Sequence, residues 1–158
     1  MAEVQTPRLP PEVAHQQSVV LLSRAAAMLM QAMVDRFGSE EAQKIAYPYL
    51  KQLGKEIASV APELGITGND ALTLSALTHL MEEQVLRVVG KPVEASPDRV
   101  VKQVTACPLQ NLPVDVCYAF QPICDGIAEA INPQYRWVLT KAIPNGDPIC
   151  EFIWEKKQ

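Results

Sequence analysis

Apolar residues recur at intervals of three and four through the first third of the chain, a spacing that predicts helices. One such stretch covers 12–37 and ends at Gly38. A second begins at Ser39, which can cap a helix, and continues to about residue 60. Pro48 lies inside it and predicts a kink or break, because proline removes one helical hydrogen bond and clashes with the preceding turn.

The first predicted helix carries more apolar residues than one buried face needs. Its middle reads VVLLSRAAAMLMQAMV, which is apolar on nearly every side. A homodimer that packs through this helix is therefore a reasonable hypothesis. One apolar stripe along it consists of Val19, Leu22, Ala26, Leu29, Met33 and Phe37.

The character of the sequence changes near residue 90. A third helix is predicted from Asn69 or Asp70 until Gly90 stops it, and GKPVEASPD then reads as a linker. Runs rich in β-branched and aromatic residues indicate strands beyond the linker, and the Asn145-Gly146 pair indicates a two-residue hairpin turn. The later elements are a strand over 99–107, a helix within 112–132, and strands over 134–143 and 149–155.

This order of elements predicts an α+β fold, with about three N-terminal helices packed on a small, mostly antiparallel C-terminal sheet with one further helix. Residues 1–11 are polar and proline-rich and are expected to form a flexible arm. Residues 12–158 are expected to form a single domain, since the linker is short and the length suits one core.

Composition narrows the classes of function. The net charge of −4 and the lack of a basic cluster argue against binding nucleic acid or an acidic membrane surface. The N-terminus does not resemble a signal peptide, and the apolar stretch 19–34 is expected to be too short and too polar to span a bilayer. A cytoplasmic location is the default expectation, and thiols there stay mostly reduced.

The four cysteines all lie in the last third of the chain, at Cys107, Cys117, Cys124 and Cys150. Four thiolates can close a tetrahedral zinc site, so zinc is a candidate cofactor. On one straight helix, however, Cys117 and Cys124 would lie roughly 10 Å apart along the axis, too far to share one ion. Both can ligate only if the helix breaks between them, and Pro122 could supply that break.

Other roles for the cysteines stay open. A site of three thiolates from Cys107, one helix cysteine and Cys150 would leave one position for water or substrate. Free cysteine is also among the most buried residue types, and Cys150 shares a strand face with Phe152 and Trp154, which suits a core position. The sequence therefore leaves metal binding, thiol chemistry and plain packing as alternatives.

The C-terminal half resembles a known family. The features that carry the likeness are Cys107-Pro108, Cys117, Cys124-Asp125-Gly126 and, above all, GDPICEF around Cys150. They resemble the L-2-amino-thiazoline-4-carboxylic acid hydrolase-like family, and FGSEEAQKIAYPYLKQLGKEIA in the N-terminal half is similar to it too. A more distant likeness is to 4-vinyl reductase domains, which are small-molecule-binding modules.

The resemblance implies hydrolysis of a thiazoline-type carboxylate ring to N-carbamoyl-cysteine. Such chemistry needs an activated water or a thiolate nucleophile, together with an acid for the leaving heteroatom. Cys124 is then the candidate nucleophile and Asp125 a proton carrier, and a metal held by cysteines could activate water instead. His79 is the best placed general base if the site lies between helix and sheet. The alternative is a non-enzymatic binding or sensor domain for a small molecule.

Overall fold

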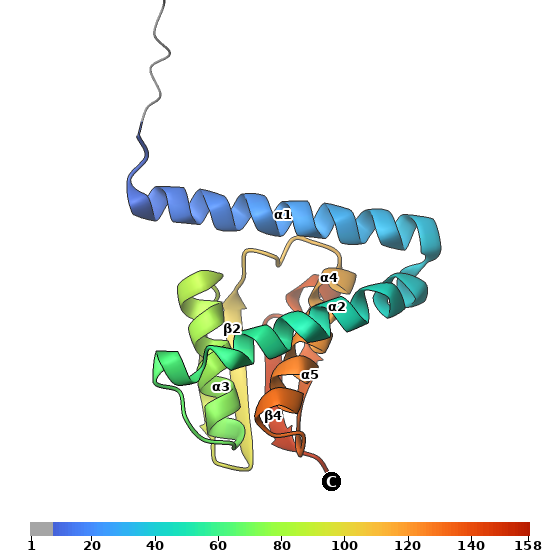
Figure 1. Cartoon of the computed structure of the whole chain (residues 1–158). Helices are drawn as coiled ribbons and strands as arrows, with labels where there is room; N and C mark the ends of the chain where they lie inside the picture. Colours follow the sequence, from blue (N-terminus) through green and yellow to red (C-terminus); the bar gives the residue numbers. More distant parts are fainter. Residues whose placement is uncertain (1–7) are drawn as a thin grey trace, which may run out of the picture.

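The computed structural model describes residues 8–158 and shows an α+β fold, as the sequence predicts (Figure 1). Helices α3 and α5 lie against a four-stranded sheet, α2 packs on α5, and α1 crosses one end of the molecule. The elements are α1 (Pro11–Phe37), α2 (Ser39–Ser59), η1 (Pro62–Leu64), α3 (Ala71–Leu80), η2 (Met81–Val85), β1 (Val89–Ala95), β2 (Arg99–Ala106), α4 (Val114–Tyr118), α5 (Phe120–Ile131), β3 (Tyr135–Lys141), η3 (Ile143–Asn145) and β4 (Cys150–Lys156).

The sheet has the order β1-β2-β4-β3, and every neighbouring pair is antiparallel. Side chains alternate between the two faces of a strand, so residues two apart share a face. The face that carries the main core holds Trp154 between Val100 and Trp137, its partners on the neighbouring strands. Cys150 and Phe152 share this face, as the sequence predicts.

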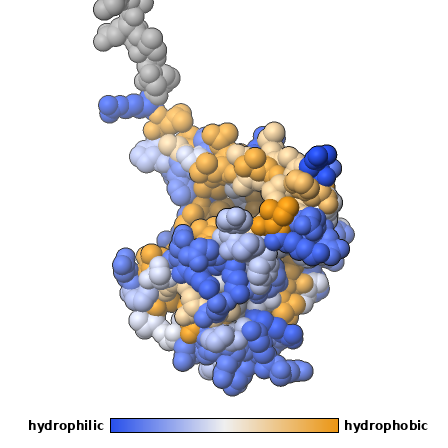
Figure 2. All heavy atoms as spheres, turned by 45° about the vertical axis from the view of Figure 1, so that its right-hand side comes forward, coloured by the Kyte–Doolittle hydropathy of each residue, from blue (hydrophilic) through white to orange (hydrophobic). Residues whose placement is uncertain are grey.

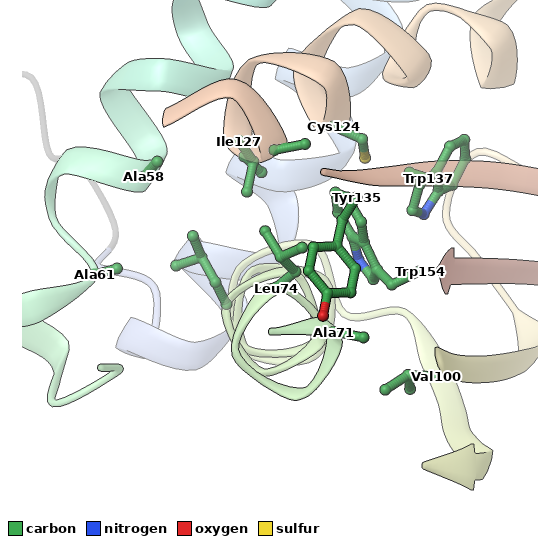
Figure 3. Packing of buried hydrophobic residues seen from close by; sticks show 12 residues of the cluster. Ala58, Ala61, Ala71, Leu74, Val100, Cys124, Ile127, Tyr135, Trp137 and Trp154 are labelled. Atoms are coloured by element: carbon green, nitrogen blue, oxygen red, sulfur yellow. The ribbon is translucent and has the colours of Figure 1, made fainter. Parts of the chain in front are cut away.

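The main core lies between this face and the helices. Figure 3 shows Leu74 of α3 and Ile127 of α5 converging with Tyr135, Trp137 and Trp154 of the sheet. These strand aromatics are therefore core residues. Trp154 also donates a hydrogen bond from Nε1 to Thr78 Oγ1, which ties the sheet to α3.

Two glycines let α2 and α5 approach closely. A Cβ built on Gly54 would lie 2.0 Å from the carbonyl oxygen of Ile123, and one on Gly126 would lie 2.0 Å from that of Lys51. Neither position has room for a side chain, so the crossing of these helices depends on both glycines. Helix α2 continues through Pro48 without the predicted break.

Four predicted boundaries are wrong, each for a local reason. The linker over 90–98 contains strand β1, an exposed edge strand in which Pro92 is tolerated because an edge strand need not donate on both sides. The third helix ends before Gly90, in the short π-helical segment η2, and Arg87 follows with φ 59°. In the β3–β4 connection only Gly146 has positive φ, so the turn is the short 3₁₀ segment η3 and not a two-residue hairpin turn.

The fourth correction concerns the predicted helix within 112–132. It consists of two helices that are separated at Ala119, so the break between Cys117 and Cys124 exists. It does not arise at Pro122, which lies in the first turn of α5, where a proline costs no helical hydrogen bond.

Helix α1 packs little of its surface on the rest of the chain. Ala27 and Met30 are buried, whereas Leu22 and Leu29 of the predicted apolar stripe are 68% and 69% exposed. Figure 2 shows apolar surface gathered in the upper part of the molecule, above a mostly hydrophilic lower body. Within residues 8–158, α1 is the one helix long and apolar enough to cross a membrane by length and composition. That the stretch 19–34 does not span a bilayer stays a prediction from the sequence.

Candidate functional site

A cavity of about 260 Å³ lies between the helices and the core-facing side of the sheet. Its wall is formed by residues from α1 to β4, and most of them are aliphatic, aromatic or cysteine. The lining residues are Ser23, Leu53, Ile57, Thr78, Met81, Glu82, Val85, Leu86, Val88, Val104, Cys107, Pro108, Leu109, Cys117, Phe120, Ile123, Cys124, Ile127, Trp137, Leu139, Cys150 and Phe152.

The fold explains why this wall is apolar. Cys150 and Phe152 come from β4 and Leu139 from β3, all on the face that the helices cover. Above them, α5 turns its buried stripe toward the sheet, and Figure 3 shows Cys124 and Ile127 on that side of the helix. The cavity thus continues the hydrophobic core and takes its character from it.

All four cysteines line this one cavity, although they are spread over 44 positions of sequence (Cys107 to Cys150). All four are free thiols. Cys107 Sγ accepts a hydrogen bond from the Leu109 amide at 3.4 Å, and Cys150 Sγ accepts one from the Ile143 amide at 3.3 Å. The cavity therefore brings together the four cysteines that the sequence analysis singled out as candidate site residues.

Burial favours the neutral form of three of the four thiols. Burial raises the pKa of Cys107, raises the pKa of Cys117 to about 11, and raises the pKa of Cys124 well above its ordinary value. A thiolate is the form that attacks a substrate or binds a metal. These three side chains thus behave at neutral pH as small apolar groups.

The donor set does not match a metal centre. Among residues 8–158, no group of three or more His, Cys, Asp or Glu side chains is placed to hold a metal ion. Zinc therefore stays a prediction from the sequence.

The three catalytic candidates lie in different places. Cys124 lines the cavity. Asp125, the next residue of α5, points toward α2, where its carboxylate accepts hydrogen bonds from the Tyr47 hydroxyl at 3.1 Å and from Gln121 Nε2 at 3.0 Å. Burial, and then the Asp125 carboxylate, raise the pKa of Tyr47. His79 lies beside the wall rather than in it.

His79 belongs to a polar cluster with two charged residues. Lys102 of β2 is 4% exposed, and its ammonium donates to Nδ1 of His79 at 2.7 Å and pairs with the carboxylate of Glu82. Burial raises the pKa of Glu82, while Lys102 opposes the shift. Burial, and then the charge of Lys102, lower the pKa of His79. Of these three, Glu82 is the one that reaches the cavity.

Lys102 is a site residue that the sequence reading missed. A signal for it exists in RVVKQVTA, where the strand alternation places Lys102 on the same face as Val100 and Val104. A lysine on the buried face of a strand needs a partner of opposite charge, because an unpaired buried charge is costly. Glu82 is noticeable in the sequence only as a neighbour of His79 on the same helix face.

The fold and the cavity define a class: a small α+β domain with an apolar pocket between its helices and an antiparallel sheet. Within that class the chain belongs to the L-2-amino-thiazoline-4-carboxylic acid hydrolase family, whose profile matches residues 19–154. An uncharacterized protein from Archaeoglobus fulgidus is 27% identical to it over 149 residues, which cover 85% of this chain and 67% of the relative.

Several solved structures share the fold. The phenol-responsive sensory domain of the transcription activator PoxR, with phenol, is 16% identical with a TM-score of 0.64, covering 85% of this chain and 74% of its own. Trafficking protein particle complex subunit 3 from Naegleria fowleri, covalently bound to palmitic acid, is 13% identical with a TM-score of 0.66, covering 90% and 97%. At these identities the likeness shows the fold alone.

Proposed function

We propose that this chain binds a small, largely apolar molecule in the cavity between its helices and its sheet. The observation that carries the proposal is the composition of the wall, in which every residue except Ser23, Thr78 and Glu82 is apolar or cysteine. Water gains few hydrogen bonds in such a space, whereas an apolar ligand regains the dispersion contacts that the empty space lacks.

The size of the cavity supports a ligand larger than one unsubstituted ring. Apolar cavities of about 150 Å³ bind benzene, and this one is about 260 Å³. A substituted aromatic ring or a short acyl chain therefore suits it. The PoxR domain, which responds to phenol, and the Naegleria subunit, which carries palmitic acid, support a ligand of this kind.

Ethylbenzene titrated into the protein tests the proposal. Trp137 lines the cavity, so its fluorescence reports occupancy together with calorimetry. Cys117→Trp, which fills the cavity from α4, should weaken binding by at least about tenfold. The matched control is Tyr118→Trp, because Tyr118 is 41% exposed and does not line the cavity. Failure of the wild type to bind, or equal affinities in the two variants, would refute the proposal.

The second candidate is hydrolysis of a thiazoline-type carboxylate, favoured by membership of the family. In this candidate Cys124 would act as nucleophile and His79 as general base. It ranks second because a substrate carboxylate needs a cationic partner, and no Lys or Arg lines the described cavity. Formation of N-carbamoyl-cysteine from L-2-amino-thiazoline-4-carboxylic acid by folded protein, and its loss in Cys124→Ala, would establish it.

We further propose that the protein is a cytoplasmic homodimer that packs through α1. The exposed leucines of this helix support a protein partner, because such a surface favours burial. The middle of α1 contains one charged residue, Arg24. In a bilayer this charge would lie among lipid tails, whereas at a dimer interface it can lie at the polar rim. A second copy of the chain is therefore the occupant that we propose for this surface.

A further inference from the structure

The core-facing side of the sheet carries a buried charged residue, Lys102, and its position next to the cavity calls for a reason. Lys102 lies between Val100 and Val104 on β2 and opposite Phe152 on β4. Its ammonium is enclosed by His79 and by Glu82 of η2. Replacing a buried ion pair with apolar residues is often neutral for stability, so this pair is not required for the core itself.

Glu82 connects the pair to the cavity. One carboxylate oxygen, Oε2, binds Lys102, and the other, Oε1, accepts no hydrogen bond from residues 8–158. The Glu82 side chain lines the cavity and is 18% exposed. The nearby Thr78 hydroxyl is already engaged, since it donates to the carbonyl of Leu74 and accepts from Trp154 Nε1. The cavity wall thus offers one carboxylate oxygen with free acceptor capacity.

We propose that Glu82 is the polar anchor of the cavity and accepts a hydrogen bond from a hydroxyl group of the ligand. The ligand class is then a neutral alcohol or phenol with an apolar body, and the inference rests on the proposed function. A carboxylate is disfavoured, because it would face the carboxylate of Glu82. A cation is disfavoured too, because Lys102 already balances that charge and a further charge would stay unpaired.

The test compares ligands of one shape with different head groups. We expect 4-ethylphenol to bind wild-type protein about tenfold more tightly than ethylbenzene, and 4-ethylbenzoate to bind more weakly than either. Calorimetry measures the three affinities. Because 4-ethylanisole keeps the oxygen and lacks the donor hydrogen, it should lose the advantage of the phenol.

Two variants then locate the anchor. Glu82→Leu combined with Lys102→Met removes both charges together and avoids an unpaired buried charge. We expect the ratio of phenol to ethylbenzene affinity to fall from about ten in the wild type to about one in this double variant. Ser23→Ala, on the α1 side of the cavity, is the control and should leave the ratio unchanged.

The outcomes separate this inference from the function on which it rests. Binding of ethylbenzene with no preference for the phenol would refute the anchor and leave the apolar pocket standing. A preference that survives in the double variant, or that disappears in Ser23→Ala, would assign the anchor elsewhere and overturn the inference. Failure of every probe to bind the wild type would remove both.

Discussion

Nζ of Lys102 lies 2.7 Å from Nδ1 of His79. An ammonium group can only donate, so Nδ1 accepts and the ring hydrogen belongs to Nε2. Nε2 in turn faces Oε2 of Glu83 at 3.2 Å. These two contacts fix one neutral tautomer of His79. Burial and the neighbouring ammonium of Lys102 lower the pKa of His79, which also favours the neutral ring.

The first prediction concerns the stability of the protein in mild acid. Below about pH 6.5 a histidine in the unfolded chain is protonated, whereas native His79, with its lowered pKa, stays neutral. The unfolded state then binds more protons, so the free energy of unfolding falls as the pH falls. The raised pKa of Glu82 has the opposite effect on stability. Native Glu82 binds its proton at a higher pH than the unfolded chain does, so this group makes the free energy of unfolding rise as the pH falls. His79→Gln should therefore lose less stability than the wild type between about pH 7 and about pH 5.

Urea unfolding followed by circular dichroism at several pH values measures this difference. His15→Gln makes the same change at an exposed position on α1 and serves as the control. Parallel pH profiles for His79→Gln and the wild type would contradict the neutral tautomer inferred from the contacts.

The second prediction concerns the buried ion pair. Lys102→Met alone leaves the carboxylate of Glu82 buried without its partner and should cost about 3–5 kcal/mol of the free energy of unfolding. Adding Glu82→Leu removes that charge, so the double variant should recover most of the loss. Chemical denaturation gives both values, and a double variant no more stable than Lys102→Met would show that the two charges are independent.

Several features of the fold could be predicted because they depend on local pattern. The helices follow from the spacing of apolar residues, and the antiparallel strands β2, β3 and β4 follow from β-branched and aromatic runs. Strand β1 could not be recognised, because it is exposed at the sheet edge and shows no alternation of apolar and polar residues. Its content of glycine and proline instead resembles a linker.

The candidate site was predictable only in part, for a similar reason. The cysteines are distinctive in the sequence, and all four line the cavity. The partnership of Lys102 with Glu82 joins positions 20 residues apart on different elements, and pairs of this kind depend on the tertiary fold. The Asp125 side chain points toward Tyr47 because α5 packs against α2. The spacing of apolar residues around Cys124 does not reveal which helix lies on that side.

The third prediction concerns the crossing of α2 and α5. Glycine to alanine inside a helix normally stabilises by up to about 1 kcal/mol. Gly126→Ala should instead destabilise by about 1–3 kcal/mol, because its Cβ would meet the carbonyl oxygen of Lys51. Thermal unfolding measures the effect, with Ala130→Ser at an exposed position of α5 as the control. A stabilised Gly126→Ala variant would show that the helices separate easily.

The fourth prediction concerns the reactivity of the thiols. With a pKa of about 11, roughly one Cys117 side chain in 10,000 is a thiolate at pH 7. Alkylation by iodoacetamide should therefore be at least about 100-fold slower in the native protein than in urea, and its rate should rise about tenfold per pH unit. Peptide mass spectrometry follows each cysteine separately. Rapid labelling of native Cys124 at pH 7 would contradict its neutral form and favour the hydrolase candidate.

The fifth prediction concerns the exposed face of α1. Leu22 and Leu29 are largely exposed, so replacing them leaves the contacts of the monomer intact. If a second copy covers this face, the wild type should sediment as a dimer at micromolar concentration. Leu22→Glu combined with Leu29→Glu should then yield a monomer of unchanged circular dichroism, since each glutamate would be buried without a partner.

The control for this change is Gln17→Glu, which adds a negative charge at an exposed polar position of the same helix. It should sediment as the wild type does. A monomeric wild type that instead binds neutral lipid vesicles through α1 would exclude the dimer, because the leucines would then be covered by lipid.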